Sequence, residues 1–236
     1  MITVKYEILE IEDGYKILDI GCGSGRHTAS LYDYKKVNVT GADLRHKDLM
    51  EAKGRLEYHD KLGAHKGGSW ALSVSDITKL PFESETFDVV ICSEVMEHVP
   101  DEENAIKELT RVLKKGKNLI VSVPRFWPER ICWALSKDYN SANDGHIRIY
   151  KKNEIIKKCE GAGVKKWNYH YAHSIHSPYW WLKCLVGPNR DDSFAVNLYH
   201  KLLTWDIMKK PFLTRFLDKL LNPVMGKSLV LYFKKE

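Results

Sequence analysis

The stretch from Lys16 to Thr28 constrains the fold of this 236-residue chain more than any other part of the sequence. It reads K-I-L-D-I-G-C-G-S-G-R-H-T, an apolar run followed by three glycines at alternate positions. A short continuous apolar run is typical of a strand that is buried on both faces of a parallel sheet. The glycines predict a tight turn into a helix from about Arg26, and the start of that helix would present free backbone N–H groups to a ligand.

The spacing of these glycines differs from that of a dinucleotide-binding loop. The dinucleotide fingerprint is G-x-G-x-x-G, in which the third glycine allows close packing of helix and strand. Gly21 and Gly23 fit this pattern, but the third position is Arg26. The pattern is instead D-x-G-x-G-x-G, beginning at Asp19, which stands among apolar residues just before the turn. A glycine-rich turn alone does not identify a ligand, so the ligand has to be inferred from the groups at the other strand ends.

A second candidate ligand group follows the next apolar run, 37–42. Asp43 closes this run and lies 18 residues after Gly25, close to the spacing of about 20 residues for an acid that binds a nucleoside ribose. A carboxylate suits that role because it can accept hydrogen bonds from both ribose hydroxyls. The alternative is that Asp43 caps the N-terminus of the next helix. The two roles are compatible, and the spacing favours the ribose.

Apolar strands and amphipathic helices alternate along the chain, which predicts an α/β fold with a parallel sheet covered by helices on both faces. The predicted strands are 17–20, 37–42, 70–74, 89–92, 119–123, 164–171 and 228–234, the last of them antiparallel. The predicted helices are 26–34, 46–57, 104–113 and 152–162. Lys114, Lys115 and Gly116 are expected to end the third helix, as cations of the last turn and a C-cap glycine.

Composition argues against several classes of protein. The apolar fraction of 44% and the charged fraction of 29% are those of a globular domain. The net charge of +6 comes from mixed charges without an arginine-rich stripe, so we expect no stable nucleic-acid partner. Neither a signal-peptide core nor a run of about 18 apolar residues is present. Five widely spaced cysteines indicate neither disulfides nor a zinc site, and they favour the cytoplasm: Cys22, Cys92, Cys132, Cys159 and Cys184.

The unusual segment is 173–227, which separates the last two predicted strands where a hairpin needs only a few residues. It holds two helical patterns, with apolar faces formed by Ala195, Leu198, Leu202 and Trp205, and by Leu213, Phe216, Leu217 and Leu220. Three interpretations stand in this order: a cap over the active-site edge, extra cover for the core, and a membrane-surface element, which the tryptophans, Lys209 and Lys210 support. We predict a core of 1–172, a helical cap of 173–227 and a final core strand of 228–236.

Several ordered motifs along residues 15–170 resemble those of class I S-adenosylmethionine-dependent methyltransferases. They are the glycine loop, the acid at position 43, L-P-F and F-D before the fourth predicted strand, and S-E-V-M-E-H-V-P-D at 93–101. The last motif is similar to that of ubiquinone-type O-methyltransferases. The resemblance implies a seven-stranded Rossmann-like sheet, S-adenosylmethionine as cofactor, and methyl transfer as the activity.

The same resemblance implies roles for individual residues around the cofactor. The loop would wrap the methionine part, with Asp19 supporting its ammonium group. Asp43 would hold the ribose, and the residue after it would lie against adenine. Asp76 would accept a hydrogen bond from the adenine amino group, and the N–H of Ile77 would meet a ring nitrogen. The implied cofactor residues are Asp19, Gly21, Cys22, Gly23, Gly25, Asp43, Leu44, Asp76, Ile77 and Ser93.

Transfer to a hydroxyl group requires a base, and histidine fits best because its pKa lies near neutrality. His98 is the first candidate, since it follows the fourth predicted strand and faces the site in related enzymes. His146 is the second candidate, and His173 and His176 at the start of the cap could also reach the site. His98 could instead be a structural histidine that is bonded to the backbone.

Glu94, Glu97 and His98 form the string E-x-x-E-H, whose counterpart in ubiquinone-type enzymes is a candidate divalent-metal site. Two carboxylates and an imidazole can bind a metal. They would converge if Glu94 and Glu97 lay on one helical turn. The string is also widespread among relatives with no evident metal requirement, so we assign no metal ligand and leave this question open.

Three functions remain for this chain. The leading hypothesis is methyl transfer to a small molecule, favouring a hydroxyl oxygen of a sugar or lipid-linked glycan. The second is a catalytically silent cofactor-binding module with a partner on its cap. The third is an RNA or DNA methyltransferase, but the N-P-P-Y motif of amino-directed DNA enzymes is absent. The leading hypothesis is supported by a similarity to a little-characterised bacterial and archaeal methyltransferase group. The similar segments are 128–136, 145–150, 176–184 and 221–228.

Overall fold

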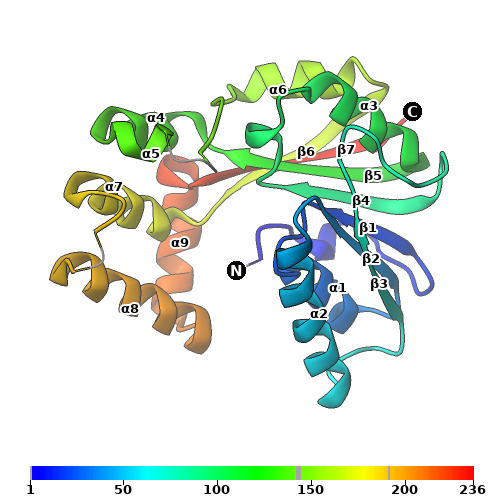
Figure 1. The fold of residues 1–236 in the computed structure, drawn as a ribbon, viewed down its shortest axis with the longest axis horizontal. Helices are drawn as coiled ribbons and strands as arrows, with labels where there is room; N and C mark the ends of the chain where they lie inside the picture. Colours follow the sequence, from blue (N-terminus) through cyan, green and yellow to red (C-terminus); the bar gives the residue numbers. More distant parts are fainter. Residues whose placement is uncertain (1, 142–144, 191) are drawn as a thin grey trace.

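The computed structural model describes residues 2–141, 145–190 and 192–236, which form a seven-stranded sheet with helices on both faces (Figure 1). The strands lie in the order β3-β2-β1-β4-β5-β7-β6. Neighbouring strands are parallel except that β7 is antiparallel to β5 and β6. The strand bounds are β1 Lys16–Ile20, β2 Asn38–Asp43, β3 Ser69–Val74, β4 Phe87–Ser93, β5 Leu113–Pro124, β6 Val164–Ala172 and β7 Ser228–Lys235.

The helices divide between the two faces of the sheet. Helices α3 and α6 cover one face, and α1 with the N-terminal segment covers the other (Figure 1). Adjacent residues of β1 show the division, because Leu18 packs under the first layer and Ile17 under the second. The bounds are α1 Arg26–Tyr34, α2 His46–Lys61, α3 Glu102–Val112, α4 Phe126–Leu135, α5 Lys137–Ser141, α6 Lys152–Glu160, α7 Ser177–Val186, α8 Phe194–Lys209 and α9 Phe212–Met225, with 3-10 helices η1 Tyr6–Ile8, η2 Met96–His98 and η3 Ser174–His176.

The strand order determines where a ligand can bind. From β1 the chain proceeds outward through β2 to β3, and then crosses back to β4 on the other side of β1. Such a reversal is a topological switch point, and ligands of open α/β sheets bind there, outside the carboxyl ends of the strands. The glycine loop follows β1 and the S-E-V-M-E-H string follows β4. Both motifs therefore lie at the switch point.

The predicted Rossmann-like fold class is confirmed, but the predicted end of the third helix is wrong. Helix α3 ends at Val112, and the Lys-Lys-Gly run 114–116 lies in β5 instead of capping the helix. The Lys114 Nζ atom lies 2.9 Å from Asp88 Oδ1 on the neighbouring strand β4. This contact with another strand supports the extended backbone, and a local sequence pattern does not contain it. Helices α4 and α5 were also not predicted.

Helices α7, α8 and α9 lie between β6 and β7 in the chain, within the segment predicted as a cap. Helix α7 packs against α4 and α8, and α9 packs against η3 and β6 (Figure 1). None of the residues of α9 is buried, and the apolar face predicted for α8 is exposed. These faces therefore do not pack on the core. Within the described ranges, no helix is both long enough and apolar enough to span a membrane.

Candidate active site

The glycine loop joins β1 to α1 at the carboxyl edge of the sheet. Gly21, Gly23 and Gly25 have positive φ angles of 68°, 53° and 74°, a region in which a side chain is strained. The Gly21 N–H donates to the Ala42 carbonyl at 2.7 Å, and the Gly23 N–H donates to Asp43 Oδ2 at 2.8 Å. The loop is thus bonded to the end of β2, and the two motifs predicted for the cofactor are in direct contact.

The three glycines leave different amounts of space around the loop. A Cβ atom on Gly21 would lie 2.2 Å from Val95 Cγ2, and one on Gly25 would lie 2.8 Å from a side chain of α2. These two glycines are required by packing. Nothing lies within 4 Å of the position that a Cβ atom on Gly23 would take. Open backbone beside the Asp43 carboxylate fits the methionine and ribose parts of S-adenosylmethionine.

Asp43 keeps capacity for a ligand. Helix α2 begins at His46 with Arg45 as its N-cap residue, so the helix-cap alternative for Asp43 is wrong. The Asp43 side chain is buried, and its two oxygens accept N–H groups of Gly23 and Arg45 at 2.8 and 2.9 Å. A carboxylate oxygen can accept a second hydrogen bond. Both oxygens can therefore still receive ribose hydroxyls.

Asp19 lies beneath the loop and is buried. Its Oδ2 accepts a hydrogen bond from Thr28 Oγ1 at 2.7 Å. Burial raises the pKa of Asp19 to about 6, so a cationic ammonium group bound nearby would favour the ionised form. Burial also raises the pKa of the Cys22 thiol, which leaves this side chain a packing group and its backbone a part of the loop.

The residues implied for adenine follow β2 and β3. Leu44 is 68% exposed, so it offers an apolar surface at the ligand edge of the sheet. Ile77 is buried, and Asp76 is exposed with its Oδ1 accepting from the N–H and the hydroxyl of Thr78, both at 2.8 Å. Ser93, at the end of β4, has its Oγ 2.8 Å from the Oγ of a β5 serine.

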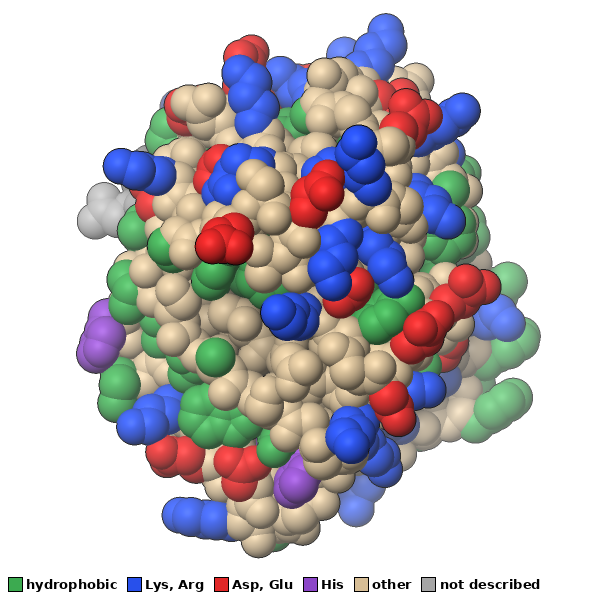
Figure 2. All heavy atoms as spheres, turned by 90° about the vertical axis from the view of Figure 1, so that its right-hand side faces the viewer, with side chains coloured by type: hydrophobic (Ala, Val, Ile, Leu, Met, Phe, Trp, Pro, Cys, Tyr) green, Lys and Arg blue, Asp and Glu red, His purple; other side chains and the backbone are tan. Residues whose placement is uncertain are grey.

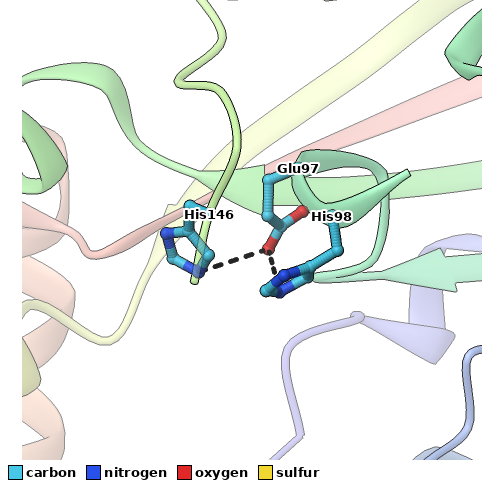
Figure 3. Close-up of side chains that lie close together, drawn as sticks. All are labelled: Glu97, His98 and His146. Carbon is cyan, nitrogen blue, oxygen red and sulfur yellow. Dashed lines mark ion pairs between the residues drawn. The ribbon is translucent and has the colours of Figure 1, made fainter. Parts of the chain in front are cut away.

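A second group of side chains lies at the carboxyl ends of β4 and β5. Glu97 and His98 belong to η2, and His146 follows α5 (Figure 3). Glu97 Oε1 lies 4.0 Å from His98 Nε2 and 3.9 Å from His146 Nε2. The two imidazole rings meet edge to face, with their centroids 5.0 Å apart. The structure therefore brings together the first two histidines that the sequence analysis proposes as bases.

Glu129 of α4 determines the orientation of His146. Its Oε1 lies 2.5 Å from His146 Nδ1, and the Glu129 side chain is 2% exposed. Burial opposes the ionisation of Glu129, but the hydrogen bond with His146 and the charge of Lys227 bring its pKa below the ordinary value. An ionised Glu129 accepts the Nδ1 proton, which leaves the lone pair on Nε2. Glu129 was not predicted as a site residue, and the only indication of its role in the sequence was its place in segment 128–136.

Glu97 contrasts with Glu129. Neither of its carboxylate oxygens has a hydrogen-bond partner within the described part of the chain. Burial, with a smaller effect of the nearby Glu94 carboxylate, raises the pKa of Glu97 well above its ordinary value. Glu94 itself accepts a hydrogen bond from the Ser122 hydroxyl at 2.9 Å. Burial therefore favours a neutral carboxyl group at Glu97, between the two histidines.

One set of three side chains has the composition of a metal site. Glu97, His98 and His146 each offer one ligand atom, and these atoms lie within 4.8 Å of one another. A carboxylate and two imidazoles are ligands that several divalent cations accept. Glu94 is not in this set, because its positive φ of 57° places it ahead of η2 and off the helical turn of Glu97. The geometry thus replaces the Glu94 of the E-x-x-E-H hypothesis with His146.

The four segments that are similar to the little-characterised methyltransferase group meet beside this cluster. Segments 128–136 and 145–150 supply the bonded pair Glu129 and His146. Lys227, from the last segment, has its Nζ 5.2 Å from the centroid of the Trp180 ring. A narrow crevice, too small for a water molecule, is lined by Pro128, Glu129, Cys132, Ser177, Trp180, Trp181 and Lys227. Distant parts of the sequence therefore build one wall of the site.

His173 and His176, the other candidate bases, are buried and do not belong to this cluster. His173 Nε2 lies 3.3 Å from Thr3 Oγ1, and the two rings have centroids 5.7 Å apart. Burial lowers both pKa values, that of His176 to about 4. Burial therefore favours the neutral form of both histidines, and neither lies with the other two candidate bases.

Comparison with known proteins finds methyltransferases among the proteins that this chain resembles. Residues 18–121 match the model of a family described as a methyltransferase domain. Methyltransferase GfsG of Streptomyces halstedii is 32% identical over 117 residues, which cover 50% of this chain and 40% of that protein. Cycloartenol-C-24-methyltransferase 1 of Oryza sativa subsp. japonica is 31% identical over 147 residues, which cover 62% and 38%. The chain thus spans about two-fifths of the length of these relatives.

The fold also has close counterparts among solved structures. The structure of BH2331, a candidate methyltransferase from Bacillus halodurans, superposes with a TM-score of 0.65. The aligned region covers 98% of this chain and 96% of BH2331, at 19% identity. At this identity the likeness concerns the fold, and it extends over the core and the segment between β6 and β7.

Proposed function

We propose that this chain, which belongs to the class I S-adenosylmethionine-dependent methyltransferases, transfers a methyl group to a hydroxyl oxygen of a small molecule. The observation that carries the proposal is His146, bonded to buried Glu129 at Nδ1 and directed toward Glu97 at Nε2. A hydroxyl group is a weak nucleophile until its proton is removed. A histidine oriented by a buried carboxylate supplies the base for that step.

Each residue of the site then has a distinct task. S-adenosylmethionine, when bound, supplies a methyl group on a sulfonium. The glycine loop and Asp43 would hold the cofactor at the switch point, and His146 Nε2 would accept the proton of the acceptor hydroxyl. The Glu129 carboxylate stabilises the imidazolium that results. His98, on the other side of Glu97, positions the acceptor hydroxyl. This proposal reverses the order of the two candidate bases.

The acceptor class follows from the wall beside His146. Tyr139 lies edge-on to His146 with centroids 6.1 Å apart, and edge-on to Trp180 at 6.0 Å. Tyrosine and tryptophan combine a large apolar ring with a polar edge. Such rings suit the apolar face of a sugar, while Lys227 can bond its hydroxyls. We therefore favour a sugar or lipid-linked glycan as the acceptor.

Two measurements separate the cofactor from the acceptor. Titration calorimetry with S-adenosylhomocysteine is expected to show binding, and its absence from wild-type protein would overturn the cofactor assignment. A methyl-transfer screen over sugars, lipid-linked sugars, phenols and amines is expected to give turnover with a hydroxyl acceptor. Turnover with amines alone would refute transfer to oxygen.

Variants of the base test the mechanism directly. His146→Ala is expected to lower kcat by about 10²–10⁴-fold, the usual contribution of a general base, and to leave S-adenosylhomocysteine affinity unchanged. Glu129→Gln should lower kcat less, because the imidazole remains. His65→Ala is a matched control, since His65 stacks on Tyr32 and is not in the cluster. An unchanged rate in His146→Ala would remove it as the base.

The other functions predict different results in the same experiments. A catalytically silent module would bind S-adenosylhomocysteine and give no transfer to any acceptor class. An RNA methyltransferase would bind RNA with an affinity that falls steeply with salt concentration, because phosphate contacts release counterions. Each outcome would replace the proposed function without affecting the assigned fold.

A further inference from the structure

The exposed apolar side chains of this protein are concentrated on the helices between β6 and β7. Of the 24 large apolar side chains that are exposed in the described part of the chain, 13 lie between Leu185 and Val224. Soluble proteins commonly expose single apolar residues, whereas a concentration of them marks an interaction surface. The face on the right-hand side of Figure 1, away from these helices, is different: Figure 2 shows basic and acidic side chains interspersed there.

Helix α9 has its polar and apolar faces inverted relative to a helix that packs on a soluble core. Asp218 Oδ1 accepts a hydrogen bond from the Ser174 hydroxyl at 2.8 Å, and Asn222 Oδ1 accepts the Ser174 N–H at 2.9 Å. The polar face therefore points toward the protein. The apolar face points outward, with exposures of 38–84% for Phe212, Leu213, Phe216, Leu217, Leu220 and Val224.

The charges of α8 and α9 are sorted in the same way. Their two acids turn inward: Asp206 is buried against Arg215 at 2.8 Å, and Asp218 bonds to η3 as described. All exposed charged side chains of these two fully described helices and of the residue that ends α8 are basic: Lys201, Lys209, Lys210, Arg215 and Lys219. A second copy of the chain would bring these cations against one another. An anionic surface would complement them.

We infer that α8 and α9 dock this protein on the surface of a membrane that contains anionic lipid. Amphipathic helices with lysine and arginine beside an aromatic-rich apolar face lie in the plane of a lipid interface, and anionic headgroups attract the cations. This surface leads toward the site, because α8 packs on α7 and α7 packs on α4, which carries Glu129. Delivery of a lipid-linked acceptor rests on the proposed function, whereas docking does not.

A groove beside α8 supports the choice of lipid over a protein partner. It has a volume of about 640 Å³ and its lining is largely apolar, including Leu182, Leu198, Leu202 and Trp205. Lys201 also lines it. An apolar groove with a cation beside it matches a hydrocarbon chain that ends in an anionic headgroup.

Vesicle co-sedimentation tests the inference with the full chain. Wild-type protein is expected to bind vesicles of phosphatidylcholine mixed with phosphatidylglycerol, and to bind pure phosphatidylcholine far more weakly. Lys209→Gln/Lys210→Gln should reduce the binding by roughly tenfold or more, since each cation near an anionic surface contributes substantially. The matched control is Lys35→Gln/Lys36→Gln, which removes the same charge from the end of α1.

A second pair of variants tests the apolar face. Phe212→Ser/Phe216→Ser should abolish binding while leaving the thermal melting temperature within a few degrees, because neither side chain is buried. Wild-type protein that ignores both kinds of vesicle, or that self-associates through this face in sedimentation velocity, would overturn the inference. S-adenosylhomocysteine binding is measured on every variant, so that loss of docking and loss of the proposed activity are told apart.

Discussion

Replacing Gly21 by alanine should destabilise the protein far more than replacing Gly23, although both glycines have positive φ. The left-handed conformation costs an alanine about 1–2 kcal/mol at either position. At Gly21 the new methyl group would also lie 2.2 Å from Val95 Cγ2, and overpacking of this kind costs roughly 1–3 kcal/mol. The expected losses of unfolding free energy are therefore about 2–5 kcal/mol for Gly21→Ala and about 1–2 kcal/mol for Gly23→Ala.

Urea denaturation of four variants separates the two contributions. Val95→Ala removes the methyl groups that the new side chain at Gly21 would meet, so Gly21→Ala/Val95→Ala should recover the overpacking part and retain the backbone strain. The double-mutant cycle should give a coupling energy of about 1–3 kcal/mol. Equal destabilisation by Gly21→Ala and Gly23→Ala, or a coupling energy near zero, would refute the packing argument.

The same variants should rank differently in cofactor binding. Alanine at Gly23 places its methyl group in the open space beside Asp43, where the structure has room for the cofactor. Affinity for S-adenosylhomocysteine should then fall by roughly tenfold or more, out of proportion to the small loss of stability. Undiminished affinity in calorimetry would place the cofactor away from this loop.

Three further predictions concern the carboxyl groups of the site. Asp43→Ala should weaken S-adenosylhomocysteine by roughly 10–100-fold in calorimetry, because hydrogen bonds to a charged group contribute about 1.5–3 kcal/mol each, and an undiminished affinity would refute the ribose role. Asp19 has a pKa of about 6 when folded and near its ordinary value when unfolded, so the folded protein holds this proton between about pH 4 and 6. The stabilisation that this extra proton gives the folded state is complete below about pH 4 and is lost as the pH rises from about 4 to 6. The loss of unfolding free energy amounts to at most about 3 kcal/mol. Urea titrations at several pH values should show this loss in the wild-type protein and not in Asp19→Asn. Glu97→Gln should retain turnover at neutral pH, and EDTA should not inhibit the wild-type enzyme; strong inhibition by EDTA that Mg²⁺ reverses would instead assign Glu97, His98 and His146 to a metal.

The parts of the site that the sequence predicts are those encoded within one short segment. The glycine loop, Asp43 and the string around His98 each follow a strand whose apolar pattern is local, so their positions at the sheet edge could be derived. The partner of His146 could not, because Glu129 reaches it from α4 across the intervening chain. The Lys-Lys-Gly run 114–116 gave a wrong prediction for the same reason: its helix-ending pattern is local, whereas the contact of Lys114 with Asp88 is not.

The helices before β7 show a different limit of sequence reasoning. The periodicity of residues 211–221 correctly predicts a helix, which the structure extends to Met225, and its apolar stripe. Periodicity does not say which way that stripe faces, because the side facing the protein is determined by the bonds of Asp218 and Asn222 to Ser174. Burial of polar groups requires such partners. The outward apolar face is thus a consequence of these two polar contacts and not of the apolar residues themselves.

Glu97 and Glu129 differ in what surrounds their buried carboxyl groups. The interior disfavours the Glu97 charge, since neither of its oxygens has a hydrogen-bond donor among the described residues, and the pKa of Glu97 lies well above its ordinary value. Glu129, which does have a donor in His146, carries the charge instead. In the proposed mechanism the two acids thus have different roles. Glu129 holds the Nδ1 proton of His146 in place, and a neutral Glu97 leaves His146 Nε2 free for a proton from the acceptor.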